Sequence, residues 1–142
     1  ETGHTDIVNY CIGDDFGVII NPMIVEGQVH GGITQGIGQA LLEDIRFEPG
    51  SAQLQTGSLM DYTLPRADDL SPIEVASAPQ PTASNPLGVK GVGESGPTGA
   101  LPATMSAILD AVAPLGIDDI AMPTTPERVW QTIRSARAQA PK

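Results

Sequence analysis

Residues 23–45, MIVEGQVHGGITQGIGQALLEDI, form the stretch on which the interpretation of the whole chain rests. Apolar residues recur there at every fourth position, at Val25, Val29, Ile33, Ile37 and Leu41. This spacing predicts a helix with one apolar stripe. The same stretch contains five interior glycines, at Gly27, Gly31, Gly32, Gly36 and Gly38. Each costs up to about 1 kcal/mol relative to alanine. Glycines of this kind allow either tight helix packing or close approach of a ligand, and the spacing leaves both explanations open.

Short β-branched runs precede this helix. Residues 6–12 and 18–20 flank the turn-forming residues 13–17, which predicts a β-hairpin with a five-residue loop. Residues 73–78 predict a further strand, and residues 53–64 are compatible with a short one. The prediction is therefore a set of short strands around the glycine-rich helix.

Two C-terminal helices are predicted, over residues 98–113 and 124–138. In the second, Thr124 and Glu127 have the spacing of a capping box. Trp130 is expected to face the core. Together with the strands, these helices predict an α+β fold.

Composition excludes several kinds of protein. The 142 residues are enough for about one domain. A net charge of −10 with seven Lys plus Arg argues against nucleic acid and anionic lipid as partners. Cys11 is the only cysteine, which excludes an internal disulfide and fits a reducing, cytoplasmic compartment. The sequence contains no Cys/His set that would predict a metal site bound by side chains, and no run of 18 apolar residues that would predict a membrane span.

The sequence does not begin with methionine. We therefore expect an excised piece of a longer chain.

A second glycine-rich stretch, GVKGVGESGPTG at residues 88–99, holds a single glutamate, Glu94. It is not a P-loop, because no Gly-Lys-Ser/Thr closes it, and residues 36–41 (GIGQAL) of the predicted helix lack the third glycine of a dinucleotide-binding fingerprint. Burial of this loop would favour the protonated carboxyl group and suit it to proton transfer near neutral pH. Lys90 could instead pair with Glu94 and keep it charged, or Glu94 could be an exposed loop carboxylate. The residues alone leave these three possibilities open.

Three segments carry a family resemblance: residues 20–41 (INPMIVEGQVHGGITQGIGQAL), 88–96 (GVKGVGESG) and 122–130 (MPTTPERVW). In this order they resemble the C-terminal part of the molybdenum hydroxylases, and the likeness extends over residues 6–138. That family includes xanthine dehydrogenase, aldehyde oxidase and aerobic carbon monoxide dehydrogenase. The resemblance implies that residues 1–142 are the C-terminal portion of a larger molybdopterin-binding catalytic domain.

The resemblance also implies a site. Glu94 matches the family's glutamate beside the molybdenum, which acts as general base toward a water-derived hydroxyl group. Gln28 matches the pterin-contacting segment and is the implied side-chain ligand of the cofactor. Backbone contacts with the cofactor are implied at Val25, Glu26, Gly27 and Gly32. Close approach of the loop to the metal is implied at Gly91, Val92 and Gly93.

The cofactor implied by the resemblance is molybdopterin with molybdenum, in the cytosine dinucleotide form. FAD and 2Fe-2S clusters are implied on partner domains or subunits, together with the remainder of the molybdenum subunit. The substrate would be a small molecule: an aldehyde, an N-heterocycle or carbon monoxide. The alternative is a non-catalytic binding or scaffold module that retains the fold. The presence of both Glu94 and Gln28 favours the enzyme.

Overall fold

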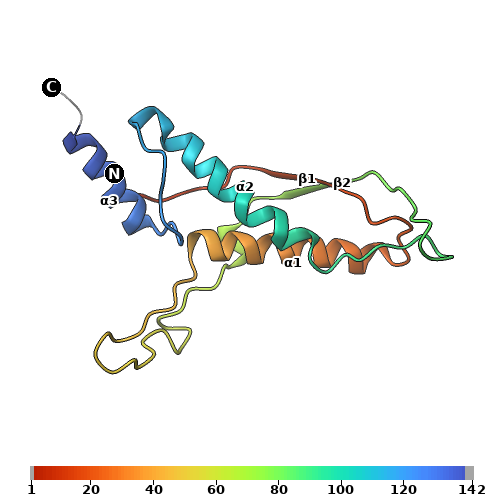
Figure 1. The fold of residues 1–142 in the computed structure, drawn as a ribbon, viewed down its shortest axis with the longest axis horizontal. Coiled ribbons are helices and arrows are strands. Elements are labelled where there is room, and N and C mark those ends of the chain that lie inside the picture. The colour runs from red at the N-terminus through yellow and green to blue at the C-terminus, as the bar shows by residue number, and fades with distance from the viewer. Residues whose placement is uncertain (1, 140–142) are drawn as a thin grey trace.

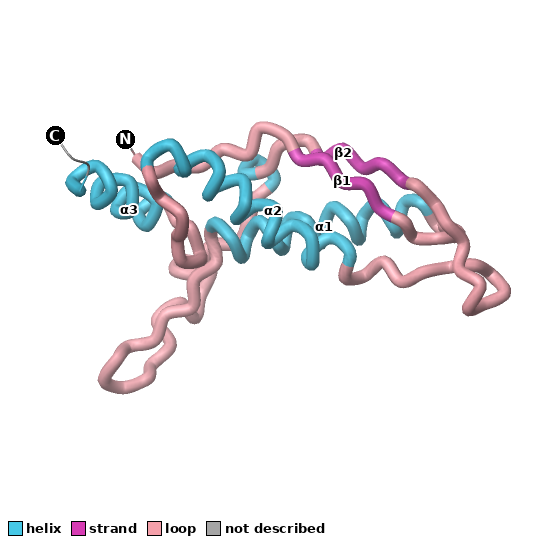
Figure 2. Tube along the Cα trace, turned by 45° about the horizontal axis from the view of Figure 1, so that its top comes forward, coloured by secondary structure: helices cyan, strands magenta, loops and turns pink. Residues whose placement is uncertain are grey.

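The structure, a computed structural model, describes residues 2–139. It contains, in chain order, β1 (Tyr10–Asp14), α1 (Pro22–Leu41), β2 (Ile73–Ser77), α2 (Ser95–Val112) and α3 (Pro126–Gln139), with short 3-10 helices at Ala67–Asp69 and Ala113–Leu115. The two strands lie on one side of the pair α1 and α2, and α3 lies beyond one end of that pair (Figures 1 and 2). The predicted α+β class is confirmed.

Helix α1 begins and ends where its local sequence directs. The side chain of Asn21 caps the helix by accepting a hydrogen bond from the Ile24 N–H at 3.2 Å, and Pro22 occupies the first turn. At the other end, the N–H groups of Leu42 and Glu43 both donate to the Gly38 carbonyl at 2.9 Å. The helix therefore ends at Leu41, the last residue of the apolar pattern, and four residues before the end of the predicted stretch 23–45.

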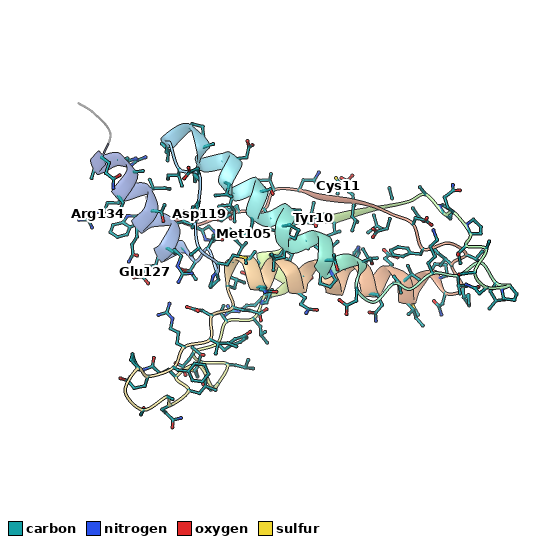
Figure 3. All side chains as sticks on the ribbon, in the orientation of Figure 1. Tyr10, Cys11, Met105, Asp119, Glu127 and Arg134 are labelled. Atoms are coloured by element: carbon teal, nitrogen blue, oxygen red, sulfur yellow. The ribbon has the colours of Figure 1, made fainter. Side chains whose placement is uncertain are left out.

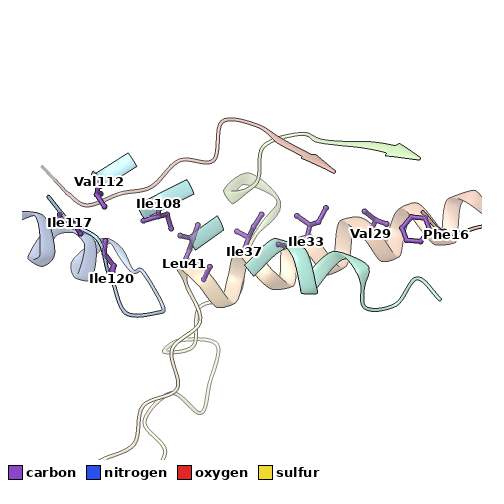
Figure 4. Close-up of a cluster of buried hydrophobic side chains, with 11 residues drawn as sticks. Phe16, Val29, Ile33, Ile37, Leu41, Ile108, Val112, Ile117 and Ile120 are labelled. Carbon is purple, nitrogen blue, oxygen red and sulfur yellow. The ribbon is translucent and has the colours of Figure 1, made fainter. Parts of the chain in front are cut away.

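The predicted apolar stripe of α1 forms the centre of the core. Val29, Ile33, Ile37 and Leu41 are buried, whereas Val25 is half-buried. Figure 4 shows the stripe running along α1 toward residues of other segments, namely Phe16, Ile108, Val112, Ile117 and Ile120. Full burial of one such side chain stabilises the fold by roughly 1.5–3 kcal/mol.

Small residues bring α1 and α2 into direct backbone contact. A Cβ atom built on Gly32 would lie 2.9 Å from the Gly96 Cα and 2.4 Å from Pro97 Cδ. One turn further along α1, a Cβ on Gly36 would lie 2.6 Å from the Ala100 Cβ. Tight helix packing therefore accounts for these α1 glycines.

Two other α1 glycines have a different environment. A Cβ built on Gly27 or Gly31 would meet no heavy atom within 4 Å. Both are exposed on the surface of α1. Packing among the described residues does not account for them, so close approach of a ligand or of another backbone stays open for these two positions.

The described helices include one that is apolar enough to cross a membrane by length and composition, Ser95–Leu115. Core helices of soluble proteins meet the same criterion, so it is weak evidence by itself. In this structure the helix packs against α1 through Gly96 and Ala100. The absence of a membrane span stays a prediction.

The sheet differs from the predicted hairpin. Strand β1 pairs in parallel with β2, from Tyr10 opposite Ile73 to Asp14 opposite Ser77. The strand predicted at 73–78 is thus confirmed as β2. The hairpin is wrong because the partner of the first strand comes from some 60 residues away, which a local turn signal cannot reveal.

Residues 18–20 form no strand. The preceding Gly17 adopts a positive φ of 62° and makes an isolated antiparallel bridge with Val89. A Cβ on Gly17 would lie 2.2 Å from the Gly88 carbonyl oxygen. The segment predicted as the second hairpin strand is therefore held against the glycine-rich loop.

Residues 42–66 form an arm that projects away from the helices (Figures 1 and 2). One antiparallel bridge between Phe47 and Leu54 takes the place of the strand considered for residues 53–64. Several large apolar side chains are exposed along the arm, at Ile45, Phe47, Leu54, Leu59, Met60 and Leu64.

The start of α3 corrects two expectations. Thr124 does not form the predicted capping box; its hydroxyl is buried and donates to the Ala40 carbonyl at 2.9 Å. Thr125 takes the capping position and accepts a hydrogen bond from the Arg128 N–H at 3.4 Å. Trp130 is 39% exposed, with the Arg134 guanidinium 5.1 Å from its ring centre, so it is not a core residue of this chain.

The helix contact predicts opposite effects at two adjacent glycines. Gly32→Ala should destabilise the chain by about 1–3 kcal/mol, because the new methyl group meets Gly96 and Pro97. Gly31→Ala should stabilise it by up to about 1 kcal/mol, because alanine favours the helix and no atom opposes it. Urea unfolding of the two variants measures both effects. Equal effects would contradict the packing described here.

Candidate functional site

The helix crossing brings two of the predicted site segments to one place. A Cβ built on Gly96 would lie 2.8 Å from both the Val29 carbonyl oxygen and the Gly32 Cα. Gln28 adjoins Val29 in α1, and Glu94 lies two residues before Gly96. The structure therefore places the backbone of the predicted cofactor segment beside that of the predicted base loop.

Glu94 occupies the N-cap position of α2 and is exposed. Its main-chain carbonyl accepts hydrogen bonds from the Thr98 N–H at 3.3 Å and the Thr98 hydroxyl at 2.6 Å. Its side chain makes no capping hydrogen bond. Of the three possibilities left open by the sequence, the structure of this chain shows the exposed carboxylate: the loop is not buried, and Lys90 pairs elsewhere.

The residues predicted to contact the pterin divide into two groups. Glu26, Gly27 and Gln28 are exposed on the first half of α1, and Val25 is half-buried. Gly32 is buried beneath the start of α2, where its close contacts are Gly96 and Pro97. The open surface for a ligand therefore lies at the N-terminal half of α1, beside Gly27 and Gly31.

The loop before α2 combines open backbone with one fixed point. Gly91 and Gly93 are exposed, and a Cβ on either would meet no heavy atom within 4 Å. Val92, between them, packs against the core. Its carbonyl accepts the Ser95 hydroxyl at 2.9 Å and the Ser95 N–H at 3.4 Å. The peptide units on either side of Val92 can thus approach a ligand while the loop stays anchored.

Asp15, which the sequence suggested only as a turn former, holds this loop. Its carboxylate accepts hydrogen bonds from the Gly17 N–H and the Gln80 N–H, both at 2.9 Å, and forms an ion pair with Lys90. The hydrogen bond from Lys90, followed by those from the two main-chain N–H groups, lowers the pKa of Asp15 from 3.8 to about 2. Asp15 is therefore ionised at neutral pH and ties three segments together.

Asn85 fixes the same loop from within. Its side-chain oxygen accepts hydrogen bonds from the Leu87 N–H at 3.1 Å and the Val89 N–H at 3.2 Å. Its amide group donates to the Val89 carbonyl at 3.0 Å. The Asn-Pro turn signal at residues 85–86 could have identified this position, because asparagine side chains commonly stabilise turns in this way.

The open surface fits a cofactor with a flat ring system and anionic groups. At the exposed glycines Gly27, Gly31, Gly91 and Gly93, main-chain peptide groups are accessible to a ligand. The exposed Gln28 side-chain amide can both donate and accept hydrogen bonds. Helix α2 begins at the same place, at Ser95, and the start of a helix favours negatively charged groups. These features are compatible with a molybdopterin.

Comparison with known proteins identifies the family. Residues 1–71 match the molybdopterin cofactor-binding domain. The chain is 38% identical over 133 residues to the carbon monoxide dehydrogenase large chain of Hydrogenophaga pseudoflava, covering 94% of this chain. It is 41% identical over 128 residues to the nicotine 6-hydroxylase large subunit of Paenarthrobacter nicotinovorans, covering 90% of this chain. This chain belongs to the molybdopterin cofactor-binding domain family of the molybdenum hydroxylases.

A solved structure agrees with the sequence relatives. The Cu,Mo-containing carbon monoxide dehydrogenase superimposes on 98% of this chain with a TM-score of 0.91 and 35% sequence identity. The matched region is 17% of that chain, and 16% of each of the two sequence relatives. The chain therefore spans about a sixth of the length of these relatives.

The Asp15 anchor predicts a specific pH dependence. Because the pKa of Asp15 is lower in the folded chain than its usual 3.8, its contribution to stability is present above pH 3.8 and lost as the pH falls toward 2. Asp15→Asn should therefore be less stable than the wild type at neutral pH, and the difference should shrink through that window. Urea unfolding as a function of pH measures this.

Asp118→Asn supplies the control, because Asp118 is an exposed acid away from this loop. Two results would contradict the anchoring role of Asp15. One is a stability difference between wild type and Asp15→Asn that stays constant down to pH 2. The other is an equal pH-dependent difference for Asp118→Asn.

Proposed function

We propose that residues 1–142 are the C-terminal portion of the molybdopterin-binding catalytic domain of a molybdenum hydroxylase, with Glu94 as its general base. The observation that carries this proposal is the contact of Gly96 with Val29 and Gly32. It holds the Glu94 loop beside the Gln28 segment in a chain that belongs to the molybdopterin cofactor-binding family.

The proposed cofactor is molybdopterin in its cytosine dinucleotide form, carrying molybdenum. Gln28 would hold it through its side-chain amide, and Val25, Glu26 and Gly27 through their backbone. Gly91, Val92 and Gly93 would bring the loop close to the metal. The open surface over Gly27, Gly91 and Gly93 supports this assignment. The bound cofactor supplies a centre for two-electron oxidation, which no side chain of the chain can provide.

The proposed role of Glu94 is to accept a proton at a carboxylate oxygen from the hydroxyl group that attacks the substrate. General bases of this kind contribute roughly 10²–10⁴-fold to the rate. A base must be held within hydrogen-bond reach of the proton that it takes. The backbone of Glu94 is fixed by Thr98, and its loop is held by the pair Asp15 and Lys90.

The relatives' names indicate the class of substrate. They include a carbon monoxide dehydrogenase, a nicotine 6-hydroxylase, a xanthine dehydrogenase subunit and an aldehyde oxidoreductase. We therefore propose a small-molecule substrate: an aldehyde, an N-heterocycle or carbon monoxide. The proposed partners are the remainder of the molybdenum subunit and 2Fe-2S and FAD domains or subunits. The proposed compartment is the cytoplasm.

The competing proposal is a non-catalytic binding or scaffold module. It predicts that the chain retains the helix crossing while neither Glu94 nor Gln28 affects a reaction. Substitution of each residue in the complete molybdenum subunit separates the two proposals.

Glu94→Gln in the complete subunit should lower turnover by about 10²–10⁴-fold while leaving molybdenum and pterin content unchanged. The amide keeps the size of the side chain but cannot accept the proton. Steady-state rates and metal analysis on the same preparation measure the two quantities.

Asp110→Asn is the matched control, because Asp110 is an exposed acid on the same helix, α2. It should keep wild-type turnover. Wild-type turnover in Glu94→Gln would contradict the assignment of the base.

Gln28→Ala should lower the molybdenum and pterin content of the complete subunit, because the side-chain contact with the cofactor is removed. Gln35→Ala is the control, since Gln35 is also exposed on α1, about two turns away. Cofactor content is measured by metal analysis and by extraction of the pterin. Equal occupancy in the two variants would contradict the role of Gln28.

A further inference from the structure

The sheet has an open edge along β1. Parallel sheets are normally buried on both faces, and a pair of strands by itself is marginally stable. In the described residues, β1 pairs only with β2. Residues 5–9 continue β1 toward the N-terminus without a main-chain hydrogen bond to another described segment. This edge therefore carries a row of unpaired N–H and C=O groups.

Residues 5–12 already have the pattern of a strand within a sheet. Their exposure largely alternates, with Ile7, Tyr10 and Ile12 packed against the core and Val8 89% exposed. Figure 3 shows Tyr10 and Cys11 on the extended segment that runs alongside α2. A segment with this pattern is prepared for pairing along its free edge.

A groove of about 400 Å³ lies between this segment and α2. One wall is the segment from Thr5 to Cys11. The other is a face of α2 formed mainly by Ala103, Ala107 and Ala111. Alanines at every fourth position leave room for a backbone to lie close to the helix.

Thr104, which also lines the groove, has an unsatisfied hydroxyl group. The residue is 6% exposed, and its hydroxyl oxygen is buried without a hydrogen-bond partner among residues 2–139. The other threonines within α1, α2 and α3 donate to the carbonyl four residues earlier: Thr34 to His30, Thr98 to Glu94 and Thr132 to Arg128. Because a buried hydroxyl group without a hydrogen-bond partner destabilises a fold, Thr104 points to a missing partner in the groove.

We propose that this groove receives a β-strand from the part of the molybdenum subunit that lies outside this chain. The strand pairs with residues 5–11 and extends the sheet. Its inner side chains are small and apolar where they meet the alanines of α2, and one of its polar groups pairs with the Thr104 hydroxyl. The inference rests on the proposal that the chain is part of a molybdenum subunit, but not on the role of Glu94.

Two observations favour this occupant over a second copy of the chain. The relatives are about six times longer than the region that they share with this chain, so the polypeptide needed to complete the sheet belongs to the same subunit. A second copy would bring together two chains that each carry a net charge of −10, which opposes association.

Hydrogen–deuterium exchange tests the pairing directly. We expect the main-chain amides of residues 5–9 to exchange about tenfold or more slowly in the complete subunit than in its Ala107→Trp variant, in which the groove is filled. The buried amides of α1 should be protected in both and serve as the internal reference. Equal exchange of residues 5–9 in the two samples would overturn the proposal.

Substitutions in the groove provide a second measurement. Thr104→Val keeps the shape of the side chain and removes the hydroxyl. It should lower the stability of the complete subunit, because the polar group of the added strand loses its partner. Ala107→Trp should fill the groove and abolish protection of residues 5–9. Ser106→Trp, on a neighbouring α2 position outside the groove, should leave that protection intact.

The outcomes separate this proposal from the proposed function. A complete subunit that holds molybdenum and turns over, with residues 5–9 unprotected, would overturn the strand and leave the function. Protected residues 5–9 in a subunit whose Glu94→Gln variant keeps full turnover would support the strand and overturn the base. Protection of residues 5–9 that is lost when a dimer of the complete subunit dissociates on dilution would identify a second copy as the occupant and overturn the proposal.

Discussion

The close contact between α1 and α2 is the constraint on which the rest of the structure depends. Gly32 and Gly36 on one helix meet Gly96 and Ala100 on the other, and a single added methyl group at Gly32 would reach backbone and proline atoms. The contact buries the apolar stripe of α1 and fixes the start of α2. Because Glu94 immediately precedes α2, the packing that stabilises the core also sets the position of the candidate base.

Electrostatic contacts at the far end of the same loop complete this placement. Asp15 is distant from Lys90 in sequence, yet its carboxylate joins that lysine to two main-chain N–H groups. An ionised carboxylate with several donors forms stronger hydrogen bonds than a neutral group does. The loop is therefore held by charge at one end and by helix packing at the other, while Gly91 and Gly93 between them stay open to a ligand.

Several surfaces of this chain have the character of interfaces. The arm over residues 42–66 exposes large apolar side chains, the β1 edge has unpaired main-chain groups, and the candidate site is open to solvent. Exposed apolar surface of this kind marks contact with other polypeptide or ligand. It agrees with a chain that spans about a sixth of the length of its relatives.

The sequence by itself determined the glycine-rich helix, the strand over residues 73–77, the α+β class and the family, because these depend on local periodicity and on motifs contiguous in the chain. It did not determine the parallel pairing of β1 with β2, the anchoring role of Asp15 or the capping of α3 by Thr125, and it placed Trp130 in the core wrongly. Each of these depends on partners that only the folded chain brings together. The α1 glycines illustrate the division. Their spacing allowed both packing and ligand contact. Only the tertiary structure separated Gly32 and Gly36, which meet α2, from Gly27 and Gly31, where an added Cβ would meet no described heavy atom within 4 Å.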